Sequence, residues 1–174
     1  MKFYKIISLI IILVFGSSNI LNADIPHFLD FKYILNKSEA GSKAQSELKK
    51  RLDNGISNLK KKEKKLQEEE KKIIQQKKII SQEEYKKKVT ELRKQVSSLQ
   101  KERNNLLETV SKQRNSARNQ ILKSLNPIIK EYMEEKKIRM VVDKKSLLLA
   151  DENLDITNDI ISILNKKLKS LKLN

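Results

Sequence analysis

The sequence contains no cysteine and only one histidine, His27. The lack of cysteine excludes disulfides, thiolate nucleophiles, thiolate metal sites and lipid anchors attached through cysteine. A lone histidine has no second histidine or cysteine with which to form a metal site, and three scattered glycines form no glycine-rich phosphate loop. We therefore expect no enzyme activity, no cofactor and no metal.

Aromatic and chain-breaking residues are also scarce. The 174 residues include no Trp, four Phe and four Tyr, which is little material for the core of a globular domain. Only three Gly and two Pro occur, so turns are few and helices should be long. These shortages favour an elongated, mostly helical protein over a compact globule.

Acidic residues are outnumbered by basic ones, and the formal net charge is +16 at pH 7. A charge of this size favours an anionic partner, or it keeps long helices soluble. A nucleic acid, an anionic membrane surface and an acidic polypeptide are all compatible with this charge.

Residues 1–23 have the pattern of a secretory signal peptide. Lys2 and Lys5 precede an apolar stretch over residues 6–15, and a polar segment then leads to a cleavage site that ends at Ala23. An uncleaved membrane anchor is the alternative, because no charged residue follows Lys5 in this segment, which is just long enough to span a bilayer. We expect cleavage near Ala23 and export, which separates the protein from nucleic acid and leaves a membrane or a protein as its partner.

A helical pattern covers residues 42–136. In its first half, large apolar residues recur every seven positions, at Leu52, Leu59, Leu66, Ile73 and Ile80. The companion heptad positions are poor in apolar residues, which predicts loose helix packing and not a tight zipper. Residues 81–84, Ser-Gln-Glu-Glu, form a capping box, after which a second apolar stripe begins. The sequence predicts two antiparallel helices with a tip near residues 79–82, and one continuous helix is the alternative.

Short strand patterns flank this helical segment. Phe28-Leu29 and residues 138–142 read as brief strands, residues 147–149 form a second apolar run, and Asp155 or Thr157 caps a final helix that ends near Lys169. Two or three short strands do not form a stable sheet alone, so we expect them to pair with each other and with copies of the chain. The residues predicted for oligomerisation are Phe28, Leu29, Val141, Val142, Leu147 and Leu149.

The chain therefore divides into a signal peptide, a helical arm and a body that is split between its two ends. The predicted boundaries are 1–23 for the signal peptide, 24–41 for the first part of the β-containing body, 42–136 for the helical hairpin arm, and 137–174 for the second part of the body with the final helix. This is an α+β fold that is mostly α.

The two ends of this arrangement resemble the Skp/OmpH family of periplasmic chaperones. Phe28-Leu29-Asp30, followed by Ile-Leu-Asn-Lys-Ser-Glu-Ala-Gly at residues 34–41, resembles the opening of that family. Ile-Arg-Met-Val-Val-Asp at residues 138–143 and Leu-Asp-Ile-Thr at residues 154–157 resemble its closing segment, whereas the arms match only in periodicity and charge. The resemblance implies a homotrimer with a small β-barrel body and long antiparallel coiled-coil arms. It also implies an ATP-independent periplasmic holdase whose arms enclose unfolded outer-membrane β-barrel proteins.

Candidate client-binding residues follow from this resemblance together with the charge of the arms. They are the lysines Lys60, Lys61, Lys64 and Lys65 and the stripe residues Leu66, Ile73, Val89 and Leu92. We expect the stripe residues to serve arm packing more than client contact. The lysine clusters also suit anionic lipid head groups at a membrane surface. The alternative function is a structural or membrane-anchored coiled-coil spacer of the envelope.

Overall fold

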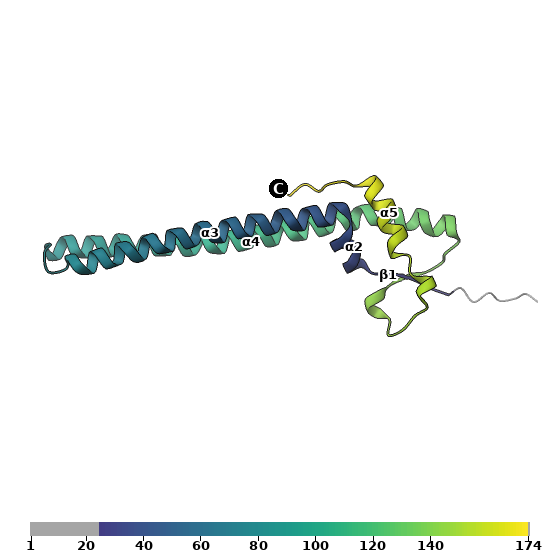
Figure 1. Cartoon of the computed structure of the whole chain (residues 1–174), viewed down its shortest axis with the longest axis horizontal. Coiled ribbons are helices and arrows are strands. Elements are labelled where there is room, and N and C mark those ends of the chain that lie inside the picture. The colour runs from purple at the N-terminus through teal and green to yellow at the C-terminus, as the bar shows by residue number, and fades with distance from the viewer. Residues whose placement is uncertain (1–24, 174) are drawn as a thin grey trace, which may run out of the picture.

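The computed structural model describes residues 25–173, in which a long helical hairpin projects from a small body (Figure 1). The predicted signal peptide lies outside the described residues. Within them, no helix is both long enough and apolar enough to cross a membrane. The elements follow in the order β1 (His27–Leu29), α2 (Phe31–Lys37), α3 (Glu39–Gln76), α4 (Gln82–Lys136), β2 (Val141–Asp143), the short 3-10 helices η1 (Lys144–Ser146) and η2 (Glu152–Leu154), and α5 (Thr157–Lys167).

The helical hairpin confirms the interpretation of the middle of the sequence. Helix α3 has 38 residues, which corresponds to about 57 Å at 1.5 Å per residue. The chain reverses after Gln76, and Ser81 caps the returning helix by accepting a hydrogen bond from the Glu84 N–H at 3.2 Å. The alternative of one continuous helix is therefore wrong.

The junction between α2 and α3 explains the Ser-Glu-Ala-Gly segment. The Ser38 hydroxyl accepts a hydrogen bond from the Gly41 N–H at 3.3 Å and so caps α3. A Cβ atom added to Gly41 would meet the Leu35 carbonyl group, whose carbon would lie only 2.9 Å away. Glycine at this position therefore lets the end of α2 lie directly against the first turn of α3.

The two ends of the chain pair as the sequence predicts. Strands β1 and β2 are parallel, with His27 opposite Val141 and Leu29 opposite Asp143. Strand β2 begins at Val141 instead of residue 138, because the Ile138 N–H bonds to Met133 O at 2.9 Å and closes the end of α4. Met140 still contacts β1, since its carbonyl accepts a bond from the His27 N–H at 3.0 Å. In the described part of the chain, the apolar run at residues 147–149 forms no strand.

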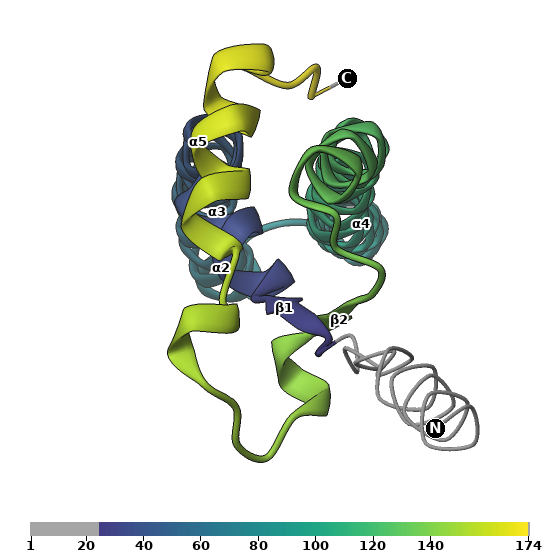
Figure 2. The same ribbon diagram turned by 90° about the vertical axis from the view of Figure 1, so that its right-hand side faces the viewer.

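The core of the body lies where α4 continues past the arm and meets α2 and α5. Its fully buried side chains include Ile34 from α2, Ile121 and Leu125 from α4, and Ile160 and Leu164 from α5. Figure 2 shows α5 standing beside α4, with α2 and β1 below it. Helix α4 therefore belongs to the arm in its first half and to the body in its second half.

Polar contacts fix the start of α5 and its position on α4. The Asp155 carboxylate accepts hydrogen bonds from the Thr157 N–H at 2.9 Å and from Lys144 Nζ at 3.2 Å. Burial opposes ionisation of Asp155, but the bonds from Thr157 and Lys144 outweigh it and lower the pKa of this carboxyl. The Tyr132 hydroxyl donates to Asp159 at 2.5 Å, and burial together with this carboxylate raises the pKa of Tyr132 to about 12. The N-cap of α5 is Ile156, and no side chain makes a capping bond there, so the prediction that Asp155 or Thr157 caps this helix is wrong. Asp155 instead bonds to Thr157, the first residue of α5, and the helix ends at Lys167 and not near Lys169.

Candidate functional site

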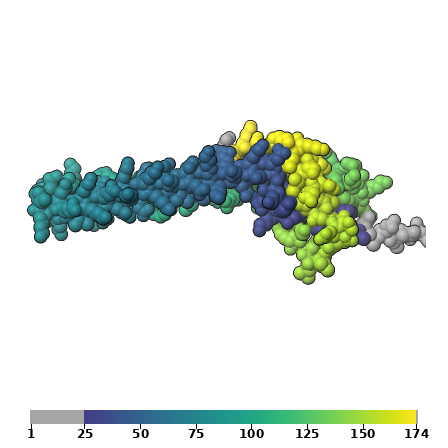
Figure 3. All heavy atoms as spheres, in the orientation of Figure 1, coloured from purple at the N-terminus to yellow at the C-terminus, as the bar shows by residue number. Residues whose placement is uncertain are grey.

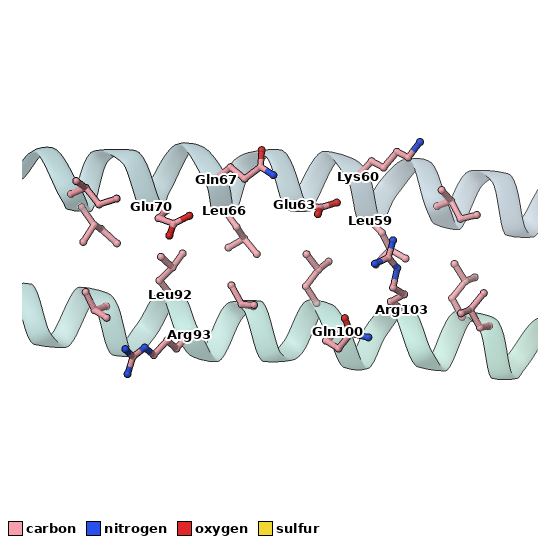
Figure 4. Close-up of a pocket in the computed structure, with 18 of the residues that line it drawn as sticks. Leu59, Lys60, Glu63, Leu66, Gln67, Glu70, Leu92, Arg93, Gln100 and Arg103 are labelled. Atoms are coloured by element: carbon pink, nitrogen blue, oxygen red, sulfur yellow. The ribbon is translucent and has the colours of Figure 1, made fainter.

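An elongated cavity of about 870 Å³ separates the two helices of the arm (Figure 4). Protein cores are normally close-packed, so a space of this size shows that the facing apolar stripes do not interlock tightly. Loose packing is what the poor companion heptad positions predict. The apolar residues that line the cavity include Ile56, Leu59, Leu66 and Ile73 of α3 and Tyr85, Val89, Leu92, Val96, Leu99 and Leu106 of α4.

The four apolar residues predicted to bind clients all line this cavity. They are Leu66, Ile73, Val89 and Leu92. Ile73 is buried, and the other three are half-buried between the helices. In Figure 4, Leu66 and Leu92 point toward the opposite helix. The structure therefore brings these residues together in arm packing, and their contact with a client stays a prediction.

The four predicted lysines do not act as one group. Lys60 lines the margin of the cavity, and its ammonium group points away from the gap in Figure 4. Lys61, Lys64 and Lys65 are exposed and do not line the cavity. These three side chains instead cover other parts of the α3 surface, where they face solvent.

Charged residues at the margin of the cavity were not predicted from the sequence. Glu63, Glu70 and Arg103 line the cavity, and in Figure 4 the Arg103 side chain reaches toward Leu59 while Glu70 lies beside Leu92. All three residues are exposed, so the edge of the cavity that they line is in contact with water. The signal available in the sequence was Arg103, which interrupts the apolar stripe of α4.

One ion pair bridges the outside of the arm. Lys62 Nζ lies 2.5 Å from Glu102 Oε2, and both side chains are about half exposed. An exposed pair of this kind contributes about 0.2–1 kcal/mol, so it helps to set the register of the helices and does not hold them together alone. The two residues are 40 positions apart, and sequence spacing gave no sign of their contact.

The tip of the arm exposes large apolar side chains that the sequence interpretation missed. Ile79 is 82% exposed and Ile74 is 59% exposed. The heptad pattern selects Ile73 and Ile80, but the turn after Gln76 ends the helix and leaves Ile79 outside the seam. Lys77 lies above the Tyr85 ring at 5.8 Å, so apolar and basic groups occur together at the tip.

The residues predicted for oligomerisation have different surroundings in the single chain. Phe28 and Leu29 are buried at 4% and 6% exposure, and Leu29 belongs to the core of the body. Val141 and Val142 are half-buried in β2. Leu147, which follows η1, is also half-buried, whereas Leu149 is 93% exposed. Within the described residues β2 pairs only with β1, so its other edge is open, and self-association stays a prediction.

The same described segment offers no metal site, since no three His, Asp or Glu side chains in it gather closely enough to hold an ion. The family model described as outer membrane protein (OmpH-like) matches residues 27–164, which is most of the chain. The chain belongs to the OmpH-like family. This membership confirms the resemblance drawn from the two ends of the sequence and supports a chaperone role.

A solved structure has the same fold as this OmpH-like protein. It is the crystal structure, at 2.83 Å resolution, of a candidate outer membrane chaperone (OmpH-like) from Caulobacter crescentus CB15. The two structures agree with a TM-score of 0.79 over 86% of this chain and 90% of that chain, at 19% sequence identity. At this identity the likeness concerns the fold alone. No curated protein matches the sequence.

Proposed function

We propose that this OmpH-like protein is an ATP-independent periplasmic holdase that binds unfolded outer-membrane β-barrel proteins. The observation that carries the proposal is an arm of about 57 Å that stands clear of the body and combines a basic exterior, an open apolar seam and exposed isoleucines at its tip. OmpH-like membership and the fold shared with a candidate outer membrane chaperone support this role.

The proposed binding mechanism combines many weak contacts. Exposed lysines such as Lys61, Lys64 and Lys65 attract acidic segments of an unfolded client. Ile74 and Ile79 offer apolar contacts at the tip without forming a pocket that would enclose one sequence. Each contact is weak and exchanges with water, so the binding energy is spread over many contacts along the client. The client is therefore released without ATP hydrolysis. Anionic lipid head groups are a further proposed partner for the same lysines.

We further propose that the functional form is a homotrimer in which the bodies build a small β-barrel and three arms surround the client. Two strands of three residues are too short to form a stable sheet by themselves. The open edge of β2 offers main-chain groups for pairing, and the exposed leucines Leu148 and Leu149 offer apolar surface near it. Cleavage near Ala23 and release into the periplasm belong to the same proposal.

The deciding experiment is light scattering after dilution of a denatured outer-membrane β-barrel protein, with and without residues 24–174. Suppressed scattering at about three chains per client supports a trimeric holdase. No suppression at any ratio contradicts the proposal and favours the envelope spacer. A protein recovered from envelope fractions with residues 1–23 still attached also favours the spacer.

A charge-reversal variant tests the role of the basic exterior. Lys60, Lys61, Lys64 and Lys65 are changed together to glutamate, which should weaken client capture and leave the assembly intact. The matched control changes four exposed lysines of the body to glutamate, at Lys32, Lys37, Lys123 and Lys166, so that net charge is equal in both variants. Equal loss of capture in both variants would show that only total charge matters.

A further inference from the structure

The last described residues of the chain, 168–173, form an extended tail across the base of the arm. Leu168 adopts an extended conformation (φ −135°, ψ 107°), and the tail then runs back from α5 along the arm (Figure 1). In Figure 2 it crosses from the side of α5 and α3 toward α4, and Figure 3 shows it lying on the first turns of α3. We call the surface beneath it the base groove, formed by Ala44, Leu48 and Arg51 of α3 and Gln113, Ala117 and Gln120 of α4.

The base groove recognises main-chain atoms of the tail. Gln120 Nε2 donates to Lys172 O at 2.8 Å, and the Lys172 N–H donates to Gln120 Oε1 at 3.1 Å. One side-chain amide thus pairs with both main-chain groups of a single residue, as a neighbouring strand would. Leu173 O accepts two more bonds, from Arg51 Nη1 at 3.1 Å and Gln113 Nε2 at 3.2 Å. Such contacts require an extended backbone and not a particular side chain.

A single apolar pocket adds selectivity to this main-chain recognition. The Leu173 side chain is only 7% exposed and packs against Ala44, Leu48 and Ala117. Two alanines that face each other across the helices leave the volume that the leucine fills. Leu171, two residues earlier, packs half-buried between this cluster and the body core. A backbone-binding groove with a pocket for an alternate side chain is typical of sites that bind extended peptides.

The tail does not satisfy the groove completely. Gln113 is 7% exposed, and its Oε1 atom is buried without a hydrogen-bond partner among the described residues. Leaving a buried acceptor unpaired is unfavourable, and an occupant with an N–H at this point would remove that cost. Lys169, Ser170 and Lys172 are exposed, and the ion pair from Lys169 to Glu39 at 3.2 Å lies at the surface. The tail is therefore held by few buried groups, whereas α3 and α4 beneath it pack in the body and the arm.

We propose that the base groove is a second polypeptide-binding site, which takes an extended segment of an unfolded chain with a leucine-sized aliphatic side chain. Residues 168–173 occupy this site in cis and compete with such a segment. The proposal rests on the proposed holdase function only in that unfolded chains supply the ligand. It adds a site at the base of the arm, remote from the exposed tip.

The test uses a fluorescently labelled peptide of the tail sequence, Leu-Lys-Ser-Leu-Lys-Leu, and anisotropy titrations with three mature full-length proteins. In the wild type, the tethered tail has an effective concentration in the millimolar range and blocks the labelled peptide. Leu173→Ala weakens this internal competitor, so the peptide should bind at least about tenfold more tightly. Adding Gln120→Ala to Leu173→Ala removes the paired main-chain bonds and should abolish that gain.

The titrations would overturn the proposal if the peptide did not bind the Leu173→Ala protein, or if it bound all three proteins equally. A peptide with alanine as its last residue is the matched ligand control and should bind the Leu173→Ala protein at least about tenfold more weakly. In the wild type, millimolar unlabelled peptide should speed amide exchange of residues 169–173 by displacing the tail. Unchanged exchange there would also contradict the proposal. These assays contain no β-barrel client. Their outcome therefore does not depend on whether the light-scattering experiment supports the holdase proposal.

Discussion

At the scale of single residues, glycine occupies two positions of α3 for different structural reasons. A Cβ atom at Gly41 would meet the main-chain carbonyl of Leu35, which cannot move without shifting the end of α2. The three atoms nearest to a Cβ atom at Gly55 would all belong to the Leu106 side chain, the closest being a methyl group at 2.5 Å. The end of a leucine side chain can change its rotamer at low cost. Gly41 therefore fixes the joint between arm and body, while Gly55 only makes room in a loose seam.

This difference predicts a large loss of stability for alanine at Gly41 and little change for alanine at Gly55. Gly41→Ala should lower the free energy of unfolding by about 2–3 kcal/mol, because the backbone clash outweighs the better helix propensity of alanine. Gly55→Ala is the matched control and should stay within about 0.5 kcal/mol of wild type or be slightly more stable. Urea unfolding followed by circular dichroism measures both. An unaffected Gly41→Ala protein would show that α2 does not need its close approach to α3.

At the scale of elements, α4 takes part in two kinds of packing. In the body, Leu125 is 1% exposed and Ile121 is 2% exposed, within a continuous core. In the arm, Leu92 is half-buried and borders the cavity between the helices. Residues of the same helix thus gain very different amounts from burial, and the arm should open locally before the body unfolds.

Paired truncations test this contrast. Leu125→Ala should destabilise the protein by about 3–4 kcal/mol, because it creates a cavity in a close-packed core. Leu66→Ala should cost only about 1 kcal/mol, because the removed atoms already border open space and part of their apolar surface stays in contact with water. Chemical unfolding gives the two free energies, and hydrogen exchange locates the loss. Equal losses would show that the arm is as tightly packed as the body.

At the scale of the whole molecule, charge and burial are separated in space. The body contains the core and both strands, while the distal half of α3 and the start of α4 carry exposed lysine clusters around a weakly packed seam. The protein has a net charge of +16, so the positive charge of the arm is not balanced by negative charge elsewhere in the sequence. Client capture through this arrangement should therefore depend on long-range electrostatics as well as on apolar contact.

Salt should weaken capture of an acidic unfolded client. Raising monovalent salt from ~0.1 M to ~1 M shortens the Debye length from about 10 Å to about 3 Å, and affinity should fall by at least about tenfold. Because the chain has no tryptophan, the tryptophan fluorescence of a client reports binding without background. The protein with Lys60, Lys61, Lys64 and Lys65 changed to glutamate should show a smaller dependence than the body-lysine control. Salt-independent capture by the wild type would contradict the electrostatic contribution.

Local patterns in the sequence were sufficient to predict the elements. The heptad stripe and the Ser81 cap predicted the hairpin and its tip, and the strand patterns at the two ends predicted that β1 and β2 pair. The hairpin and its tip depend on a repeated period and on residues close together in the chain, so sequence alone determines them. The pairing of β1 with β2 joins distant residues, and only the tertiary structure shows its parallel register.

Only the tertiary structure decided which side chains meet. Ile138 closes the end of α4 instead of extending β2, Ile79 is exposed at the tip, and Arg103 lies at the margin of the cavity. The Leu173 side chain packs between α3 and α4, and its carbonyl accepts a bond from Arg51, 122 positions away. No local pattern in the sequence encodes these contacts. Periodicity specifies which face of a helix is apolar, but the partner of that face depends on how distant segments share limited space. For this protein, the sequence determined the two arm helices and the Ser81 cap between them, and three-dimensional packing determined the cavity, the open strand edge and the base groove.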